Sequence, residues 1–142
     1  MRPPLDAAGG LYEERVDRIA GLRVDEVAAE ALQKGEERAR AAEAERLRAR
    51  LLPRALRVAL DPGGPVPASS PAFAAWLERR MQDRPVAFVV GGAVGISSDL
   101  LAECDERLSL GPLTMPHQLA RVVLAEQLYR ALCISSGHPY PH

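Results

Sequence analysis

The sequence predicts an α/β fold in which helices cover a mostly parallel sheet. Short apolar runs rich in β-branched residues alternate with stretches of helical periodicity, which is the pattern of βαβ units. One run, Val86–Val90, is almost continuously apolar, as expected of a parallel strand covered on both faces. The length of 142 residues suits one domain spanning residues 1–142.

Composition indicates an ordinary globular protein, with 47% hydrophobic and 26% charged residues. The net charge of −1 does not by itself demand a nucleic-acid partner. Basic residues are nearly all arginine, since Lys34 is the one lysine among 18 basic residues. Arginine binds phosphate through two hydrogen bonds, so RNA stays a candidate partner.

Neither cysteine suggests a disulfide or a metal site. Cys104 and Cys133 lie in apolar helical patterns without CxxC or Cys/His spacing, and we expect buried, reduced thiols. No apolar run approaches the roughly 20 residues of a membrane span, and the N-terminus lacks the apolar region of a signal peptide. The expected location is cytoplasmic, with no membrane partner.

The first quarter of the chain predicts mixed local structure. Met1–Gly10 contains two prolines and two glycines and suggests an irregular start. The apolar spacing of Leu11–Ile19 predicts a short amphipathic helix ended by Gly21. The alternating LRVDEV of Leu22–Val27 predicts a short strand.

Ala28–Leu52 is rich in Ala, Glu and Arg and predicts a helix that Pro53 ends. Gly35 is a candidate break, with a loop before it. Alternating charges of this kind favour a solvated helix with i,i+4 ion pairs, and an RNA-facing surface is the alternative.

The central region predicts a strand, a turn and a helix. Ala55–Leu60 is an apolar run followed by the turn residues of Asp61–Gly64. Ser70 is then the predicted N-cap, with Pro71 in the first helical position. Trp76 lies on the apolar face of this helix, which favours a core position over a base-stacking platform.

The last third predicts two more strands and two helices. After Val86–Val90, Ser97 or Ser98 should cap a helix that runs to about Glu106, and Arg107–Leu110 should form a short strand. A long helix is expected from about Gln118 to Ser135, followed by an extended tail with Gly137, Pro139 and Pro141. This helix is apolar nearly all round, which predicts burial against the sheet and against a second subunit.

Ligands of open α/β sheets bind beyond the carboxyl ends of the strands. Three predicted strand ends carry small or polar residues there: Leu60-Asp61, Gly91-Gly92 and Leu110-Gly111. The GGAVG segment is not a dinucleotide fingerprint, because Ala93 stands where GxGxxG needs its second glycine. A plain tight turn explains GGAVG equally well.

Few polar side chains near these ends are candidates for chemistry. His117 follows Pro116 at the start of the last helix, and a lone histidine there suits a structural hydrogen bond or a catalytic role. Glu126 and Arg130 have the i,i+4 spacing of a structural ion pair. His138 and Tyr140 lie in the Gly/Pro tail, which either folds back onto a site or stays loose. The residues predict a nucleotide-like or cofactor pocket without naming a reaction.

Three segments carry a family resemblance: FVVGGAVGIS (Phe88–Ser97), RLSLGPLTMPHQLARVVLAEQLYRA (Arg107–Ala131) and HPY (His138–Tyr140). Together they resemble the RlmH family, bacterial methyltransferases of the SPOUT superfamily that modify N3 of a pseudouridine in large-subunit (23S) rRNA. VALDPGG (Val58–Gly64) is similar to the first cofactor-contacting loop of that family.

The resemblance implies a C-terminal trefoil knot, a homodimer, and S-adenosylmethionine as methyl donor to 23S rRNA within the ribosome, without metal or DNA. Substrate-side roles are implied for His117, or for Tyr140 with His138 of the partner chain, in positioning the base or relaying its N3 proton. Arg121 and Arg130 are implied phosphate contacts. The implied cofactor pocket comprises Leu60, Asp61, Gly91, Gly92, Leu110, Gly111, Pro112, Leu113, Thr114, Met115 and Pro116.

The chain departs from the family pattern in three places, and the first two, together with the near-neutral net charge, support an alternative function. The family begins with a β-strand, for which Met1–Gly10 is short and Pro-rich. Its tail continues from HPY with histidine and a basic residue, where this chain has Pro141-His142. Ala93-Val94 replaces the usual Pro-Glu of the glycine turn. The alternative is a catalytically weak or inactive SPOUT-fold dimer that binds RNA or the ribosome.

Overall fold

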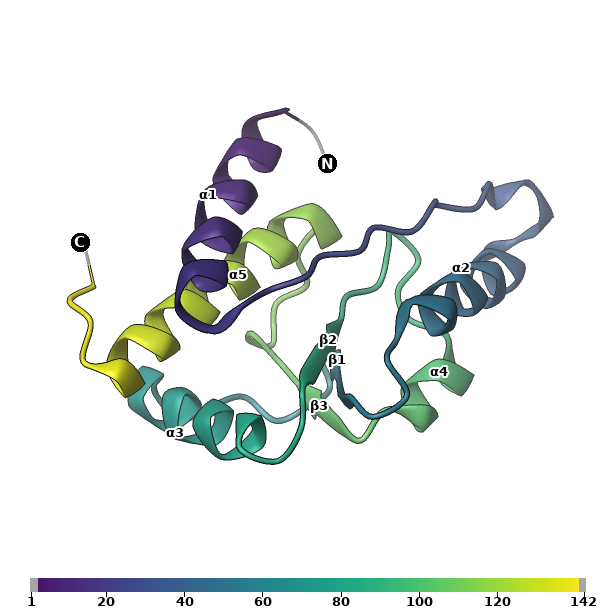
Figure 1. The fold of residues 1–142 in the computed structure, drawn as a ribbon. Helices are drawn as coiled ribbons and strands as arrows, with labels where there is room; N and C mark the ends of the chain where they lie inside the picture. Colours follow the sequence, from purple (N-terminus) through teal and green to yellow (C-terminus); the bar gives the residue numbers. More distant parts are fainter. Residues whose placement is uncertain (1–2, 141–142) are drawn as a thin grey trace.

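The computed structural model describes residues 3–140 (Figure 1). In chain order the elements are α1 (Pro3–Ala20), the 3-10 helix η1 (Leu32–Lys34), α2 (Glu36–Arg50), β1 (Leu56–Leu60), α3 (Ser70–Met81), β2 (Val86–Val89), α4 (Ser98–Glu103), β3 (Glu106–Leu108) and α5 (His117–Ser136).

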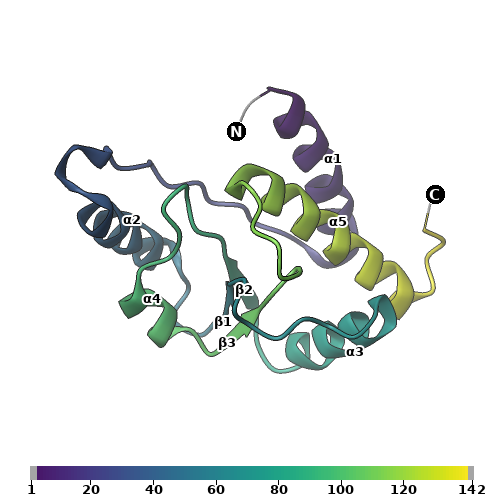
Figure 2. The same ribbon diagram turned by 180° about the vertical axis from the view of Figure 1, so that it is seen from behind.

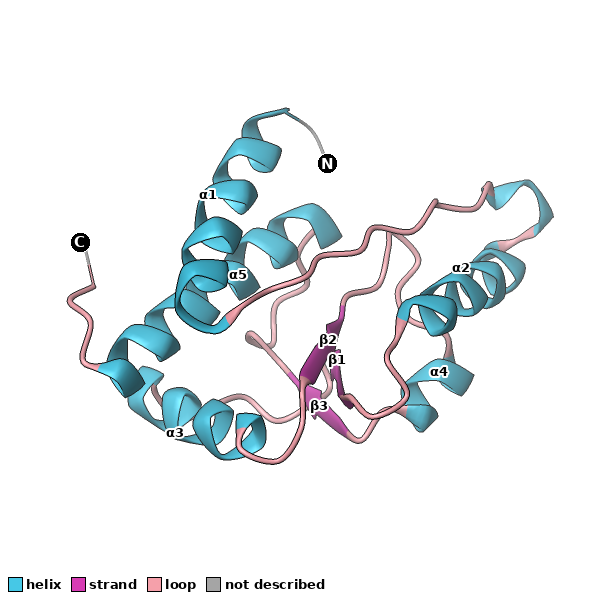
Figure 3. Ribbon diagram, viewed as in Figure 1, coloured by secondary structure: helices cyan, strands magenta, loops and turns pink. Residues whose placement is uncertain are grey.

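The three strands form one parallel sheet in the order β2-β1-β3, at the centre of the molecule (Figure 3). Leu56 of β1 is opposite Val86 of β2, and Leu60 is opposite Leu108 of β3. The Asp61 amide donates to the Leu108 carbonyl at 2.9 Å, so the pairing continues one residue past β1. The predicted α/β class and parallel sheet are confirmed.

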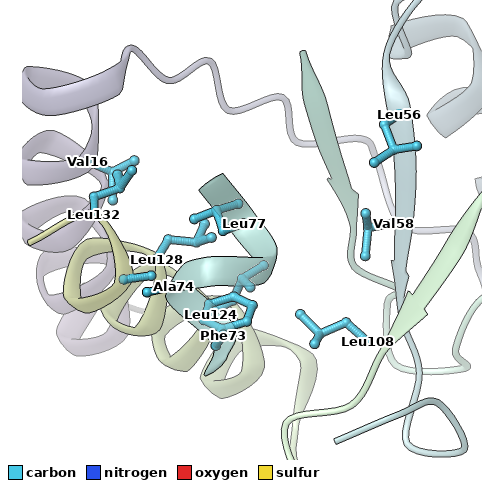
Figure 4. Packing of buried hydrophobic residues seen from close by; sticks show 11 residues of the cluster. Val16, Leu56, Val58, Phe73, Ala74, Leu77, Leu108, Leu124, Leu128 and Leu132 are labelled. Carbon is cyan, nitrogen blue, oxygen red and sulfur yellow. The ribbon is translucent and has the colours of Figure 1, made fainter. Parts of the chain in front are cut away.

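Helices α3 and α5 cover one face of this sheet and form the larger core (Figure 4). Val58 is fully buried beneath side chains of both helices, among them Phe73 and Leu124. Helix α1 packs on the outer side of α5, where Val16 meets Leu132. The face that α5 buries is therefore shared between the sheet and two helices.

Helices α2 and α4 lie on the opposite side of the sheet, as the two opposed views show (Figures 1 and 2). Their core is smaller and consists of Ala44, Val89 and the fully buried Leu100, with four partly buried neighbours. Alternation along β2 explains the division, because Phe88 packs into the first core and Val89 into the second.

Trp76 belongs to the core, as predicted. Its ring stacks on Phe73 with centroids 5.7 Å apart, and its indole N–H donates to Glu106 at 3.3 Å. Arg80 forms an ion pair with the same carboxylate at 2.7 Å and lies over the Trp76 ring. These contacts tie α3 to β3.

The predicted irregular start is wrong for Pro3–Gly10, which belongs to α1; Met1 lies outside the described residues. Proline is tolerated in the first helical turn, where its missing N–H would have no partner. The two glycines disfavour a helix, but Gly9 is buried, and packing of α1 on α5 outweighs that intrinsic preference. Pro3–Gly10 is therefore helical and does not form a strand.

The predicted strand at Leu22–Val27 is also wrong, because this segment has no regular structure. Alternation placed Leu22 and Val24 on one face, yet Val24 is 43% exposed while Leu22 packs on the core. The charged residues of this segment form ion pairs. Arg23 pairs with Asp25, and Glu26 pairs with Arg121 of α5.

Several element boundaries differ from prediction. Helix α2 begins only after Gly35, whose φ of 97° makes it the break that the sequence suggested, and residues before it are loop and η1. Ser69 rather than Ser70 caps α3, accepting from the Ala72 amide at 3.1 Å. Ser97 caps α4, one of the two serines proposed.

Helix α4 ends at Glu103, before the predicted Glu106, and β3 spans Glu106–Leu108 instead of Arg107–Leu110. The cause is Asp105. Its amide donates to the Arg57 carbonyl at 2.8 Å and its carboxylate accepts from the Arg57 amide at 2.8 Å, which draws the chain into the sheet.

The last helix is confirmed, with Gly137 ending it at φ 75°. The following residues to Tyr140 have no regular structure, as predicted, and Pro141 lies outside the described range. Burial of α5 against the sheet is confirmed through Leu124 and Leu128. Leu119 and Ile134 remain 40% and 45% exposed, and contact with a second subunit stays a prediction.

Cys133 is buried and Cys104 half-buried, and both are free thiols. Burial raises the pKa of the Cys104 thiol, which makes the thiolate scarcer. Across residues 3–140, no helix is long and apolar enough to cross a membrane.

Replacement of Leu100 by alanine tests the smaller core. We expect Leu100→Ala to lower the free energy of unfolding by about 2–5 kcal/mol, because the site is fully enclosed between α4, α2 and the sheet. Denaturant titration at fixed protein concentration measures the change. Leu52→Ala, at a side chain 49% exposed, is the matched control with a change within about 0.5 kcal/mol. Equal losses for the two variants would contradict this assignment of the core.

Candidate cofactor-binding site

A cavity of about 520 Å³ lies beyond the carboxyl ends of the three strands. Its walls are the segments that follow β1, β2 and β3, together with the first turn of α5. The lining residues are Leu60, Asp61, Pro62, Val90, Gly91, Gly92, Ala93, Gly95, Ile96, Leu101, Leu110, Gly111, Leu113, Thr114, Met115, Pro116, His117 and Ala120. The predicted cofactor residues are thus brought together, with the exception of Pro112, which does not line the cavity.

The wall after β1 is fixed by Asp61. Its carbonyl accepts from the Gly64 amide at 2.9 Å, which closes the turn, and its carboxylate accepts weakly from the Gly63 amide at 3.4 Å. Arg107 of β3 lies 3.4 Å from the same carboxylate. Gly64 is packed against the β3 backbone so tightly that a Cβ there would meet Arg107 Cβ at 2.9 Å.

The wall after β2 is the glycine turn, defined here as Gly91–Gly95. The Gly95 amide donates to the Gly92 carbonyl at 3.0 Å, and Gly95 has a φ of 82°. A Cβ on Gly91 would lie 2.7 Å from the Gly95 carbonyl carbon, so the two ends of the turn approach as only glycine allows. The segment is a tight turn, as one interpretation held, and it also lines the cavity.

The wall after β3 is the loop from Leu110 to Pro116. Ser109 fixes its start: the hydroxyl donates to the Gly111 carbonyl at 2.8 Å and accepts from the Gly111 amide at 3.1 Å. Ser109 is almost completely buried, and its amide donates to the Pro65 carbonyl. Farther along, Leu113 is 79% exposed at the cavity mouth.

His117 is the first residue of α5 and lies exposed on the cavity wall. Pro116 is the N-cap and provides no side-chain capping bond. The Ala120 amide is the first to bond back, to the Pro116 carbonyl at 2.9 Å. The first turn of α5 therefore places His117 at the cavity wall.

The other two predicted catalytic residues lie at the opposite end of α5. The tail folds back only as far as Glu126, which lies roughly 14 Å along α5 from His117, and neither His138 nor Tyr140 lines the cavity of the same chain. The Tyr140 hydroxyl donates to Glu126 at 2.5 Å, and the Arg130 guanidinium lies 4.2 Å from the Tyr140 ring centre. The tail folds back, but onto its own helix.

Burial and the hydrogen bond to Glu126 raise the pKa of Tyr140 from 10.0 to about 12. In this position Tyr140 is a hydrogen-bond donor at neutral pH. Arg130 pairs with the same carboxylate, at 3.2 Å. The predicted i,i+4 pair of Glu126 and Arg130 is thus confirmed, and the tail is part of it.

Arg121 does not face the cavity. It binds Glu13 of α1 through two hydrogen bonds, of 2.7 and 3.0 Å, and also pairs with Glu26. Both arginines expected to contact phosphate therefore already contact carboxylates of this chain.

Sequence reasoning missed part of the apolar lining and one residue that supports a wall. Pro62, Ile96, Leu101 and Ala120 supply apolar surface, and Ser109 holds the third wall without lining it. Their signals are weak, because Ile96 and Leu101 look like ordinary core residues. Ser109 could have been found, since a serine two residues before a glycine at a strand end is typical of a hydroxyl-closed turn.

The cavity suits a nucleotide-like cofactor of modest size. Its volume lies within the range of small-molecule sites, and apolar walls at Val90, Ile96 and Leu110 combine with the Asp61 carboxylate and exposed glycine backbone. Side-chain clusters able to hold a metal ion are absent from residues 3–140.

The elevated pKa of Tyr140 is open to a direct test. A phenol whose pKa is raised from 10.0 to about 12 stabilises the fold below pH 10, and this contribution is lost as the pH rises toward 12. We expect phenolate absorbance to show an ionisation near pH 12 that is missing in Tyr140→Phe, and that moves toward 10 in Glu126→Gln. If Tyr140→Phe instead removes an ionisation near pH 10, the tail does not dock on Glu126.

Comparison with known proteins identifies the family of this chain. The family model described as "Predicted SPOUT methyltransferase" matches residues 1–142. A protein of Rhodospirillum rubrum named ribosomal RNA large subunit methyltransferase H is 47% identical over 133 residues, covering 92% of this chain and 86% of that protein.

Two further proteins bear the same name. The one of Acidiphilium cryptum is 54% identical over 99 residues, covering 69% of this chain and 62% of its own length. The one of Gluconacetobacter diazotrophicus is 58% identical over 88 residues, covering 61% and 57%. The chain thus spans about three fifths of these two relatives. The match over all 142 residues and the identity to these relatives show that the chain belongs to the SPOUT methyltransferase family, among the relatives of the RlmH proteins.

Proposed function

We propose that this protein methylates N3 of a pseudouridine in 23S rRNA within the ribosome, with S-adenosylmethionine as methyl donor. The observation that carries the proposal is the cavity. It is lined by the segments that follow all three strands, and most of the residues that the family resemblance implies for the cofactor are among the lining residues. Family membership and the names of the relatives support the same chemistry.

Leu60, the glycine turn and the loop Leu110–Pro116 would hold S-adenosylmethionine. Apolar side chains from these segments suit the adenine, and backbone groups beside Gly91 and Gly111 suit its polar edges, because neither residue has a side chain to keep a ligand away. When bound, the cofactor supplies a methyl group made electrophilic by its sulfonium.

The chain's own residues must orient the base and remove its N3 proton. His117 suits this task because it lies on the cavity wall as the first residue of α5, and an imidazole nitrogen can act as a general base. Tyr140, with its pKa raised to about 12, suits the donation of a hydrogen bond better than the acceptance of a proton.

A homodimer in the cytoplasm is part of the proposal. The hydrogen bond from Tyr140 to Glu126 holds the tail away from His117 of its own chain, so the tail could assist only the cavity of a second copy. Arg121 and Arg130 would contact phosphate by exchanging carboxylate partners for phosphate ones, since both anions accept paired hydrogen bonds from a guanidinium.

The same contacts favour a second candidate, a dimer that binds RNA or the ribosome with little or no catalysis. Tyr140, Arg130 and Arg121 are all engaged within their own chain, which leaves substrate contact dependent on rearrangement.

Calorimetric titration with S-adenosylmethionine tests the cofactor. We expect saturable binding at one molecule per cavity, and no binding of NAD, because the glycine turn lacks the dinucleotide spacing. Absence of binding at millimolar S-adenosylmethionine would exclude the methyltransferase and leave the RNA-binding alternative.

His117→Ala tests the substrate side. We expect methyl transfer to ribosomes from a strain lacking the modification to fall by about 10²–10⁴-fold, with cofactor affinity nearly unchanged. Gln118→Ala, at the adjacent position outside the cavity lining, is the control and should retain activity. Full activity of His117→Ala would remove the histidine from the mechanism.

A further inference from the structure

We propose that Arg40 and Glu43 of α2 are positioning residues that hold the glycine turn, and with it one wall of the cofactor cavity, in place. The inference rests on the proposed function, since the cavity is taken as the S-adenosylmethionine site. It gives a role to α2, for which the sequence suggested a solvated or RNA-facing surface. No residue of α2 lines the cavity.

Glu43 is the more unusual of the two because it is a carboxyl group only 8% exposed. Burial of such a group is costly unless its oxygens have partners. One oxygen, Oε2, accepts from the Glu30 amide at 3.1 Å. The other, Oε1, points at the glycine turn, where a Cβ added to Gly92 would lie 2.9 Å from it.

A side chain at position 92 would therefore meet the Glu43 carboxyl group. The φ of Gly92 is not positive, so backbone conformation does not require glycine there. The nearest atoms to the missing Cβ are all carboxyl atoms of Glu43. The side of Gly92 on which a Cβ would lie thus faces Glu43 of α2. Gly92 also lines the cavity.

Arg40 contacts the turn at a second point. Its Nη1 donates to the Val94 carbonyl at 3.2 Å. The same guanidinium forms ion pairs with Glu37 at 3.2 Å and Glu36 at 3.5 Å. The Arg40 side chain is 26% exposed. The Glu43 carboxyl group beside Gly92 and the hydrogen bond from Arg40 to Val94 fall on both sides of Ala93, so together they limit movement of the turn more than either does alone.

Arg40 and Glu43 are called the clamp below. The Glu43 side of the clamp is held in place by neighbouring residues. Arg46, one turn after Glu43 on α2, donates to the Ala28 carbonyl at 2.8 Å and pairs with Glu30 at 2.6 Å. The segment 28–30 is therefore held between Arg46 and Glu43, and it keeps the Glu43 carboxyl group directed at the turn. Glu45 faces away and pairs only along the helix, with Arg48, in a contact 77% exposed on the glutamate.

A double-mutant cycle between positions 43 and 92 tests the clamp, with calorimetric affinity for S-adenosylmethionine as readout. Gly92→Ala should weaken binding on the order of tenfold, because the added methyl group displaces the turn against a fixed carboxyl group. In the Glu43→Ala background the same methyl group meets no obstacle, and its effect should fall to about twofold or less.

Conservative and control variants separate positioning from general stability. Glu43→Gln keeps the shape and an acceptor for the Glu30 amide, so it should bind nearly as the wild type does, whereas Glu43→Ala should bind more weakly. Glu45→Ala and Arg38→Ala on the same helix are the matched controls for Glu43→Ala and Arg40→Ala. Equal effects of Gly92→Ala in both backgrounds, or unchanged affinity in Glu43→Ala, would overturn the proposal.

Hydrogen exchange without cofactor keeps this test independent of the proposed function. The Gly95 amide, bonded to the Gly92 carbonyl, should exchange faster in Glu43→Ala and Arg40→Ala than in the wild type and in both controls. If the wild type fails to bind S-adenosylmethionine, the cofactor assignment fails while faster exchange still supports the clamp. Unchanged exchange overturns the clamp whatever the protein binds.

Discussion

The cavity depends on the parallel pairing of β1 with both of its neighbours. Because the three strands run in one direction, the segments that follow them leave the sheet at one edge and meet there. The bond from the Asp61 amide to the Leu108 carbonyl extends this alignment to the start of the cavity wall. Reversal of one strand would send its loop to the opposite edge and remove a wall.

Two helical layers then give this edge its rigidity, in different ways. On one face α5 joins core and site, because Leu124 is buried under the sheet while His117 starts the same helix at the cavity. On the other face α2 reaches the glycine turn through polar contacts rather than apolar packing. The cavity thus depends on both layers: α5 lines it with His117 and Ala120, and α4 lines it with Leu101, while α2 contributes no lining residue.

Local pattern predicted the parts of the fold that local forces determine. The apolar runs of β1 and β2 and the long periodicity of α5 appear where expected, and the strand ends located the cavity. The start of α1 and the segment 22–27 were not predictable, because the packing of α1 on α5 and the pairing of Glu26 with Arg121 are tertiary contacts. The approach of Glu43 to Gly92 joins residues far apart in sequence and left no local signal. The trefoil knot remains an expectation from the family.

The central claim is that the cavity at the carboxyl edge binds S-adenosylmethionine. A crystal structure of the protein with this cofactor at saturating concentration tests it most directly. The account predicts density for the cofactor between Leu60, the glycine turn and the loop Leu110–Pro116, with its methyl group accessible from the side of His117. Cofactor density at another surface, with this cavity filled only by solvent, would contradict the account.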